Sequence, residues 1–136
     1  GEAGKNGGSS GDLYIFIGMN SNSIFTREGE HLFINAPIDL YTAVNGGSIE
    51  VPSPDGKKIR ISVSAGTQNG KRFRLRGKGM PILQTRSFGD LYVEAELETP
   101  VNLTNKQKKL IADFSESLSE SNTPRVKKFK SFLNNY

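Results

Sequence analysis

The 136-residue sequence contains no cysteine and only one histidine, His31. The lack of cysteine excludes disulfide bonds and thiolate metal sites from these residues. A single histidine is too few for a metal cluster or a catalytic triad built on imidazole. No apolar run approaches the roughly 20 residues that span a bilayer, and no signal-like segment opens the chain. These absences argue against a metal centre, a triad hydrolase and a membrane protein.

Recognisable catalytic and nucleotide-binding motifs are also missing. The sequence has no Gly-x-Ser-x-Gly nucleophile elbow. The stretch Arg76–Gly79 only loosely resembles a phosphate-binding loop, because the four residues between glycines and the Lys-Ser/Thr pair of a Walker loop are absent. Its glycines are better explained by the backbone freedom that a loop between strands requires. We therefore expect no enzymatic activity.

Two rows of charged residues are the other candidate site. One row is acidic (Glu94, Glu96, Glu98), and the other is basic (Arg72, Arg74, Arg76, Lys78). Each row occupies one face of a predicted strand, because side chains alternate between the two faces of a sheet. Matched rows of opposite charge favour cross-strand ion pairs on a solvated face over acid–base catalysis.

The net charge of +4 is confined to one segment. Four basic residues and no acid lie in 124–136, and the rest of the chain has 14 basic and 14 acidic residues. Because the excess is local, the composition does not describe a uniformly basic face for nucleic acid.

Alternating apolar and polar residues predict a β module in the middle of the chain. In Lys57–Val63 the apolar residues Ile59, Ile61 and Val63 alternate with polar ones, which gives one buried and one solvated face. The turn Ser53–Gly56 has proline and glycine at the positions that a tight hairpin requires. Asp39 is a candidate cap for a short helical turn. We expect a mainly β, antiparallel, sandwich-like module.

A repeated motif indicates tandem modules. Gly-Asp-Leu-Tyr occurs at 11–14 and again at 89–92, each time before a strand-like run and after a glycine-rich segment. The pattern predicts the last strand of a first β module, followed by a second module.

The period of the apolar residues changes to a helical one near the C-terminus. Thr104 and Gln107 form a capping box, and Thr123 with Pro124 begins a second helix. The two apolar stripes exceed what a finished small sheet covers, so we expect them to form a dimer interface. The stripes consist of Leu110, Ile111, Phe114, Leu118, Val126, Phe129, Phe132 and Leu133.

Several stretches in a fixed order resemble the second C-terminal β domain of the DnaJ-type co-chaperones of bacteria. They are Ala43–Pro52, Ala65–Gly70, Phe73–Pro81, Gly89–Leu91 and Glu98–Leu103. Residues 2–13 resemble the end of the first such domain. The resemblance implies the end of a first β domain in residues 1–18, a complete second β domain in 19–103 and a helical dimerisation tail in 104–136.

Two properties of intact co-chaperones are not expected of this chain. The His-Pro-Asp motif that stimulates a DnaK-type ATPase is absent, since His31 is followed by Leu32. The zinc-binding cysteine repeats are absent as well. No cofactor is therefore expected here, and the resemblance places zinc only in the cysteine-rich region of an intact protein.

The resemblance implies a cytoplasmic chaperone that binds unfolded polypeptides, forms a homodimer and serves a DnaK-type partner in protein folding and stress response, without nucleic-acid or membrane partners. A strand edge beside an apolar groove can hold an extended peptide as an added strand. The candidate client-binding residues are Leu32, Phe33, Ile34, Leu40 and Val44. These residues are alternatively part of the core. Two other functions stay open, a basic nucleic-acid-binding β module and a purely structural dimerisation module.

Overall fold

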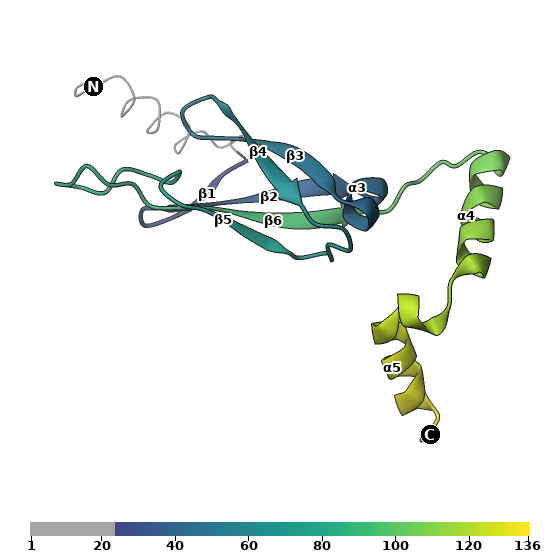
Figure 1. Ribbon diagram of the computed structural model, residues 1–136. Helices are drawn as coiled ribbons and strands as arrows, with labels where there is room; N and C mark the ends of the chain where they lie inside the picture. Colours follow the sequence, from purple (N-terminus) through teal and green to yellow (C-terminus); the bar gives the residue numbers. More distant parts are fainter. Residues whose placement is uncertain (1–23) are drawn as a thin grey trace. The chain divides into compact units, whose positions relative to one another are not determined.

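The computed structural model describes residues 24–136, which fall into two compact units that divide between Thr99 and Pro100. The predicted end of a first β domain, residues 1–18, and the first Gly-Asp-Leu-Tyr copy lie outside the described residues. The first unit contains β1 (Thr26–Glu28), β2 (His31–Asp39), α3 (Leu40–Asn45), β3 (Gly47–Pro52), β4 (Lys58–Val63), β5 (Arg72–Leu75) and β6 (Leu91–Glu98) (Figure 1). The second unit contains α4 (Asn105–Ser117), the 3-10 turn η1 (Glu120–Asn122) and α5 (Pro124–Leu133).

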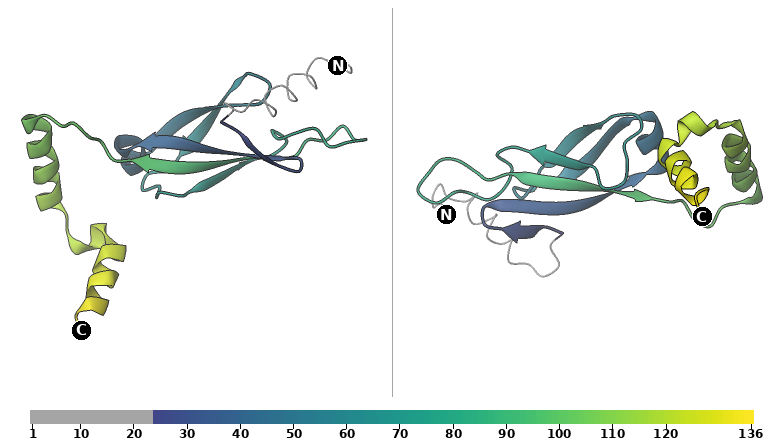
Figure 2. Two further views of the ribbon diagram at one scale, coloured as in Figure 1. Left: turned by 180° about the vertical axis from the view of Figure 1, so that it is seen from behind. Right: turned by 90° about the horizontal axis from the view of Figure 1, so that it is seen from below.

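The predicted fold class is confirmed, because two sheets form a mainly β module and short helices follow it in the sequence. The larger sheet has the strand order β1-β2-β6-β5, and β3 pairs with β4 in a separate ribbon. Figure 2 shows this ribbon on one side of the larger sheet, with α3 at one end of the same unit.

One strand pair differs from the expected antiparallel pairing. β2 and β6 are parallel, in a register that runs from Leu32 opposite Leu91 to Asp39 opposite Glu98. The other strand pairs are antiparallel, as expected, and this central pair is the exception. Alternation along each strand predicts which face is buried, and it is the same whichever way the partner strand runs.

The β3–β4 hairpin forms as its turn residues predict. Its register pairs Val51 with Ile59, and the turn between the strands contains Pro54 and Gly56, whose φ of 87° favours glycine. The Asp55 carboxylate accepts hydrogen bonds from the Ser53 hydroxyl and from the Lys57 N–H. The side chain and the backbone together fix the turn.

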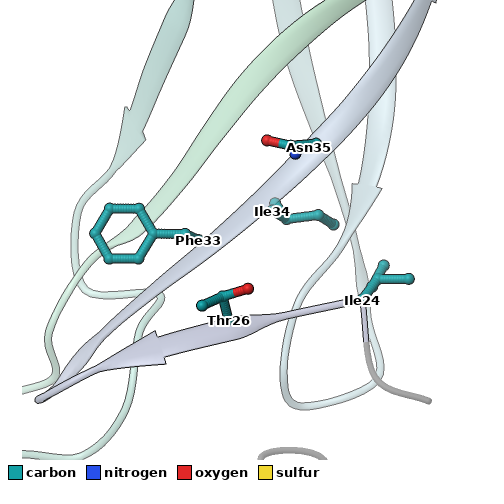
Figure 3. A pocket seen from close by; sticks show the side chains of 5 residues that line it. All are labelled: Ile24, Thr26, Phe33, Ile34 and Asn35. Atoms are coloured by element: carbon teal, nitrogen blue, oxygen red, sulfur yellow. The ribbon is translucent and has the colours of Figure 1, made fainter. Parts of the chain in front are cut away.

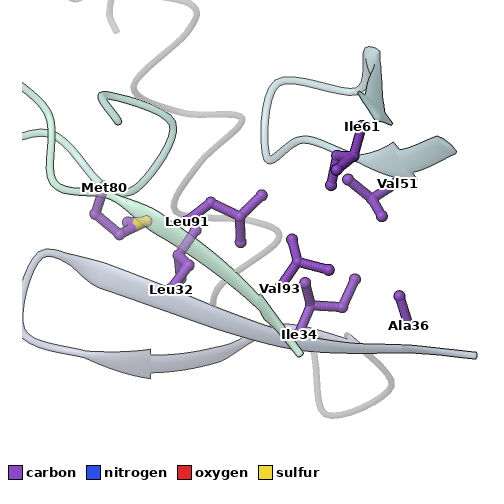
Figure 4. Close-up of a cluster of buried hydrophobic side chains, with 8 residues drawn as sticks. All are labelled: Leu32, Ile34, Ala36, Val51, Ile61, Met80, Leu91 and Val93. Atoms are coloured by element: carbon purple, nitrogen blue, oxygen red, sulfur yellow. The ribbon is translucent and has the colours of Figure 1, made fainter. Parts of the chain in front are cut away.

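The main core lies between the larger sheet and the ribbon. Figure 4 shows Val51 and Ile61 of the ribbon above Ile34 and Val93 of the sheet. The whole cluster consists of Leu32, Ile34, Ala36, Val51, Ile61, Met80, Leu91 and Val93. Each large apolar side chain that is fully buried contributes about 1.5–3 kcal/mol, so this cluster is the main source of stability in the unit.

The short helix α3 begins where the sequence predicts. Asp39 is its N-cap, and the carboxylate accepts hydrogen bonds from the N–H and the hydroxyl of Thr42 at 3.0 and 2.8 Å. The helix ends at Gly46, whose φ is 83°. The cap fixes the end of β2 and the direction of the chain into the ribbon.

An arm between β5 and β6, residues 76–90, projects beyond the end of the larger sheet (Figure 1). Its base is held by backbone hydrogen bonds, from Met80 N–H to the Glu30 carbonyl and between Gly79 and Gly89, all of 2.8 Å. A Cβ on Gly79 would lie 2.6 Å from the Asp90 carbonyl oxygen, and one on Gly89 would overlap the Glu30 carbonyl. These two glycines therefore allow the close approach of three backbone segments.

The second unit begins with the predicted capping box. The Thr104 side chain accepts from the Gln107 N–H, and the Gln107 side chain accepts from the Thr104 N–H. Pro124 is the first residue of α5 as expected, but the predicted side-chain cap by Thr123 is wrong. Thr123 has ψ of 70°, outside the extended conformation of most N-caps, and only its backbone carbonyl bonds to the helix, to Lys127.

Candidate functional site

The edge of β2 next to β1 is the feature of the first unit with the clearest binding potential. β1 pairs only with the first three residues of β2, and the last of these pairs joins Thr26 to Phe33. β2 continues to Asp39, so residues 34–39 have no strand partner on this side within residues 24–136. An unpaired strand edge is a template for the backbone of another extended segment.

The direction of the backbone groups supports this assignment. The Leu32 N–H donates to the Asp90 carbonyl at 2.9 Å, so the even-numbered residues of β2 direct their N–H toward β6. The odd-numbered residues, Asn35 and Pro37 among them, direct theirs toward the edge. Proline is tolerated in a strand where its missing N–H falls on the unpaired side. Pro37 therefore costs β2 no hydrogen bond to a neighbouring strand of the described sheet.

A small pocket lies where β1 diverges from β2. It has a volume of about 240 Å³ and is lined by Ile24, Thr26, Phe33, Ile34 and Asn35 (Figure 3). Ile34 is 5% exposed and forms the apolar floor, whereas Ile24 is 59% exposed at the rim. The pocket adjoins the backbone groups of Asn35, so one added strand can use both features.

A cluster of rings and a guanidinium fixes one wall of this pocket. The rings of Phe33 and Tyr92 stack with centroids 5.1 Å apart and an interplanar angle of 14°. The Arg72 guanidinium carbon lies 5.6 Å from each of these ring centroids, and its nearest nitrogen is 3.8 Å from a Glu94 oxygen. Such contacts hold Phe33 in one position on the outer face of the sheet.

The five predicted client-binding residues do not form one site in the structure. Leu32 and Ile34 belong to the core, as the alternative interpretation anticipates, and only Ile34 reaches the pocket. Phe33 lies on the outer face and lines the pocket. Leu40 and Val44 lie in α3, at the far end of β2, and neither lines it. Client binding by these residues stays a prediction.

Sequence reasoning missed three residues of the pocket, Ile24, Thr26 and Asn35. Ile24 and Thr26 share a face just before the turn into β2, and Asn35 follows Phe33 at the spacing of one strand face. The proline two residues after Asn35 was the available signal, since it marks the side of β2 that has no strand partner among residues 24–136.

The predicted ion pairs form only in part. Arg72 pairs with Glu94, as the sequence indicates. Arg74 instead binds Asp90, with 2.7 Å between its Nε and a carboxylate oxygen, so the prediction that it pairs with the acidic row is wrong. The reason is the register, because Glu94 faces the first residue of β5 and Glu96 extends past the end of that strand.

Asp90 ties together the base of the arm and the start of β2. Its carboxylate accepts hydrogen bonds from the Gly77 N–H at 3.0 Å and from Arg74 at 2.7 Å, and its backbone N–H donates to Nδ1 of His31 at 3.0 Å. The hydrogen bond from Gly77, followed by that from Arg74, holds the pKa of the Asp90 carboxyl below its usual range. This residue is therefore a structural anchor.

The anchor predicts a pH dependence of stability. Because the folded-state pKa of Asp90 lies below the unfolded value of about 3.9, its contribution is present above that value and is lost as pH falls through the folded pKa. Asp90→Asn should lower the urea midpoint at pH 7, and the gap between the variant and the parent should narrow toward pH 3. An equal gap at both pH values would contradict the assignment.

The described residues contain neither a metal-ligand cluster nor a membrane-spanning helix. In the part of the chain from 24 to 136, no three histidine, cysteine, aspartate or glutamate side chains lie together as metal ligands. No helix in that part is long and apolar enough to cross a membrane.

The sequence matches a family model, the DnaJ C terminal domain, over residues 1–100. The chain belongs to this family. It is 49% identical over all of its 136 residues to the chaperone protein DnaJ of Roseobacter denitrificans, of which the match covers 35%. It is 52% identical over 90% of its length to that of Azorhizobium caulinodans, covering 32% of the relative. The chain thus spans about a third of the length of these curated relatives.

Proposed function

We propose that this chain is the part of a DnaJ-type co-chaperone that holds extended segments of unfolded polypeptides and joins two copies of the protein. It acts in the cytoplasm, without enzymatic activity of its own, and delivers clients to a DnaK-type chaperone. The observation that carries the proposal is the open edge of β2 beside an apolar pocket, in a member of the DnaJ C-terminal domain family.

Strand addition suits a protein that must accept many clients. Backbone hydrogen bonds to the edge supply affinity that does not depend on the client sequence, and the pocket takes one apolar side chain. Beyond β1 the edge offers the backbone groups of only three residues, Asn35, Pro37 and Asp39, and Pro37 has no N–H, so binding at this edge is short and reversible. A client can therefore be released to a partner chaperone.

The second unit supports the dimer. All eight residues of the two predicted stripes are exposed, from 36% for Leu118 to 65% for Phe129. Leaving several large apolar groups in water forgoes about 1.5–3 kcal/mol for each that a partner buries fully. Two copies would also hold two client sites on one scaffold, which raises the avidity for a long unfolded chain.

Binding of a labelled, uncharged apolar peptide to the full chain tests the client site. Ile24→Asp places a charge at the rim of the pocket and should weaken peptide binding about tenfold, the equivalent of about 1.4 kcal/mol. Leu83→Asp is the matched control, because Leu83 is 89% exposed on the arm and lies outside the pocket. An equal loss of peptide affinity in both variants would refute the pocket as the client site. No peptide binding by the parent chain would favour a purely structural module.

A further inference from the structure

We propose that the β2 edge selects extended polypeptide segments in which a basic residue stands two or four positions from an apolar one. This inference rests on the proposed client binding and adds the chemical class of client that the edge prefers. It follows from the position of an acidic row relative to the pocket.

The register determines the spacing. Asn35, which lines the pocket, shares the outer face of the sheet with Pro37 and Asp39. A client residue opposite Asn35 lies at the pocket, and the residues two and four positions further along the client face Pro37 and Asp39 on the same side. A residue three positions away points to the other face.

A second acidic row, distinct from the one along β6, lies along this path. It consists of Asp39 on β2 and of Glu96 and Glu98 on β6, which are paired in register with Pro37 and Asp39. All three side chains are exposed, and none forms an ion pair within residues 24–136. A basic side chain of the client can cross the small ring of Pro37 toward Glu96 or contact Asp39 directly.

The neighbouring charges leave this row negative. On the same face of β5, Arg72 is matched by Glu94 and held over two rings, and Arg74 is paired with Asp90. Asp39 stays ionised at neutral pH, because the two hydrogen bonds from Thr42 keep the pKa of its carboxyl below the usual value. The occupant is thus an extended chain that supplies backbone groups, one apolar side chain and a positive charge.

Three synthetic nine-residue peptides with a central leucine in a serine background test the selection. One has lysines four positions to either side of the leucine, an isomer has them three positions away, and the third has none. Because lysines stand on both sides of the leucine, one of them faces Asp39 whether the peptide adds parallel or antiparallel to β2. At low ionic strength the first peptide should bind about two- to fivefold tighter than the other two, since one of its lysines faces Asp39 and an exposed ion pair contributes about a factor of two to five. Added salt should remove the difference.

The double variant Glu96→Gln/Glu98→Gln should bring the first peptide down to the affinity of the uncharged one. Glu50→Gln/Glu116→Gln is the control, because it removes the same charge from β3 and α4. Equal binding of all three peptides to the parent chain would overturn the selection and leave the proposed client site intact. Lack of binding by any peptide would overturn both. If the control variant weakens binding of the first peptide equally, the preference for lysine comes from the net charge of the chain, and the proposed selection by this acidic row is overturned.

Discussion

Replacing Gly89 by alanine should destabilise the first unit by about 3 kcal/mol or more, because the change forces overlap in a fixed, buried backbone. The new Cβ would overlap the Glu30 carbonyl, which already accepts the Met80 N–H at 2.8 Å. Neither segment can move alone, since Asp90 next to it anchors both β2 and the arm. Urea denaturation of the full chain, followed by near-ultraviolet circular dichroism, measures the loss.

Gly56→Ala is the matched control for this prediction. Gly56 has a φ of 87°, which also disfavours alanine, but a Cβ there would meet no atom within 4 Å. The control should therefore lose only about 1–2 kcal/mol, the cost of a left-handed backbone in a non-glycine residue. If the two variants are equally stable, the steric role of Gly89 is refuted.

The second large effect concerns assembly. The parent chain should sediment as a dimer at tens of micromolar, well above a dissociation constant of about 1 μM, and Phe129→Asp/Phe132→Asp should sediment as a monomer. These phenylalanines are 65% and 56% exposed on α5. Burying them in a partner is favourable, whereas burying two unpaired carboxylates is strongly unfavourable.

Ser131→Asp controls for the added charge on the same helix. At 100° per residue Ser131 lies opposite the apolar stripe, so it should remain outside the interface and leave the dimer unchanged. A monomeric parent chain at this concentration would refute the dimer. Loss of the dimer in the serine variant would show that the charge of the helix, and not its apolar stripe, controls assembly.

Local signals in the sequence predicted much of the structure. The turn at Ser53–Gly56, the Asp39 cap and the Thr104 capping box depend on residues a few positions apart, and each of them is confirmed. Alternation along β4 gave the buried face correctly, with Ile61 and Val63 inside. These features need no knowledge of which distant segment lies alongside.

Features that depend on pairing between distant segments were harder to predict from the sequence. The parallel pairing of β2 with β6 brings together residues 59 positions apart, such as Leu32 and Leu91, and the alternation is the same for either direction. The partner of Arg74 is decided by the same register. The open edge of β2 also follows from it, although Pro37 was a local sign of that edge.

Amide NMR of the peptide complex tests the central claim most directly. If an extended apolar peptide adds as a strand to β2, hydrogen exchange of the Asn35 N–H, which is directed at the edge, should slow by at least tenfold at saturation. The Ile34 and Ala36 amides face β6 and should keep the exchange rates of the free chain. Unchanged exchange at Asn35 with the peptide bound would contradict strand addition at this edge.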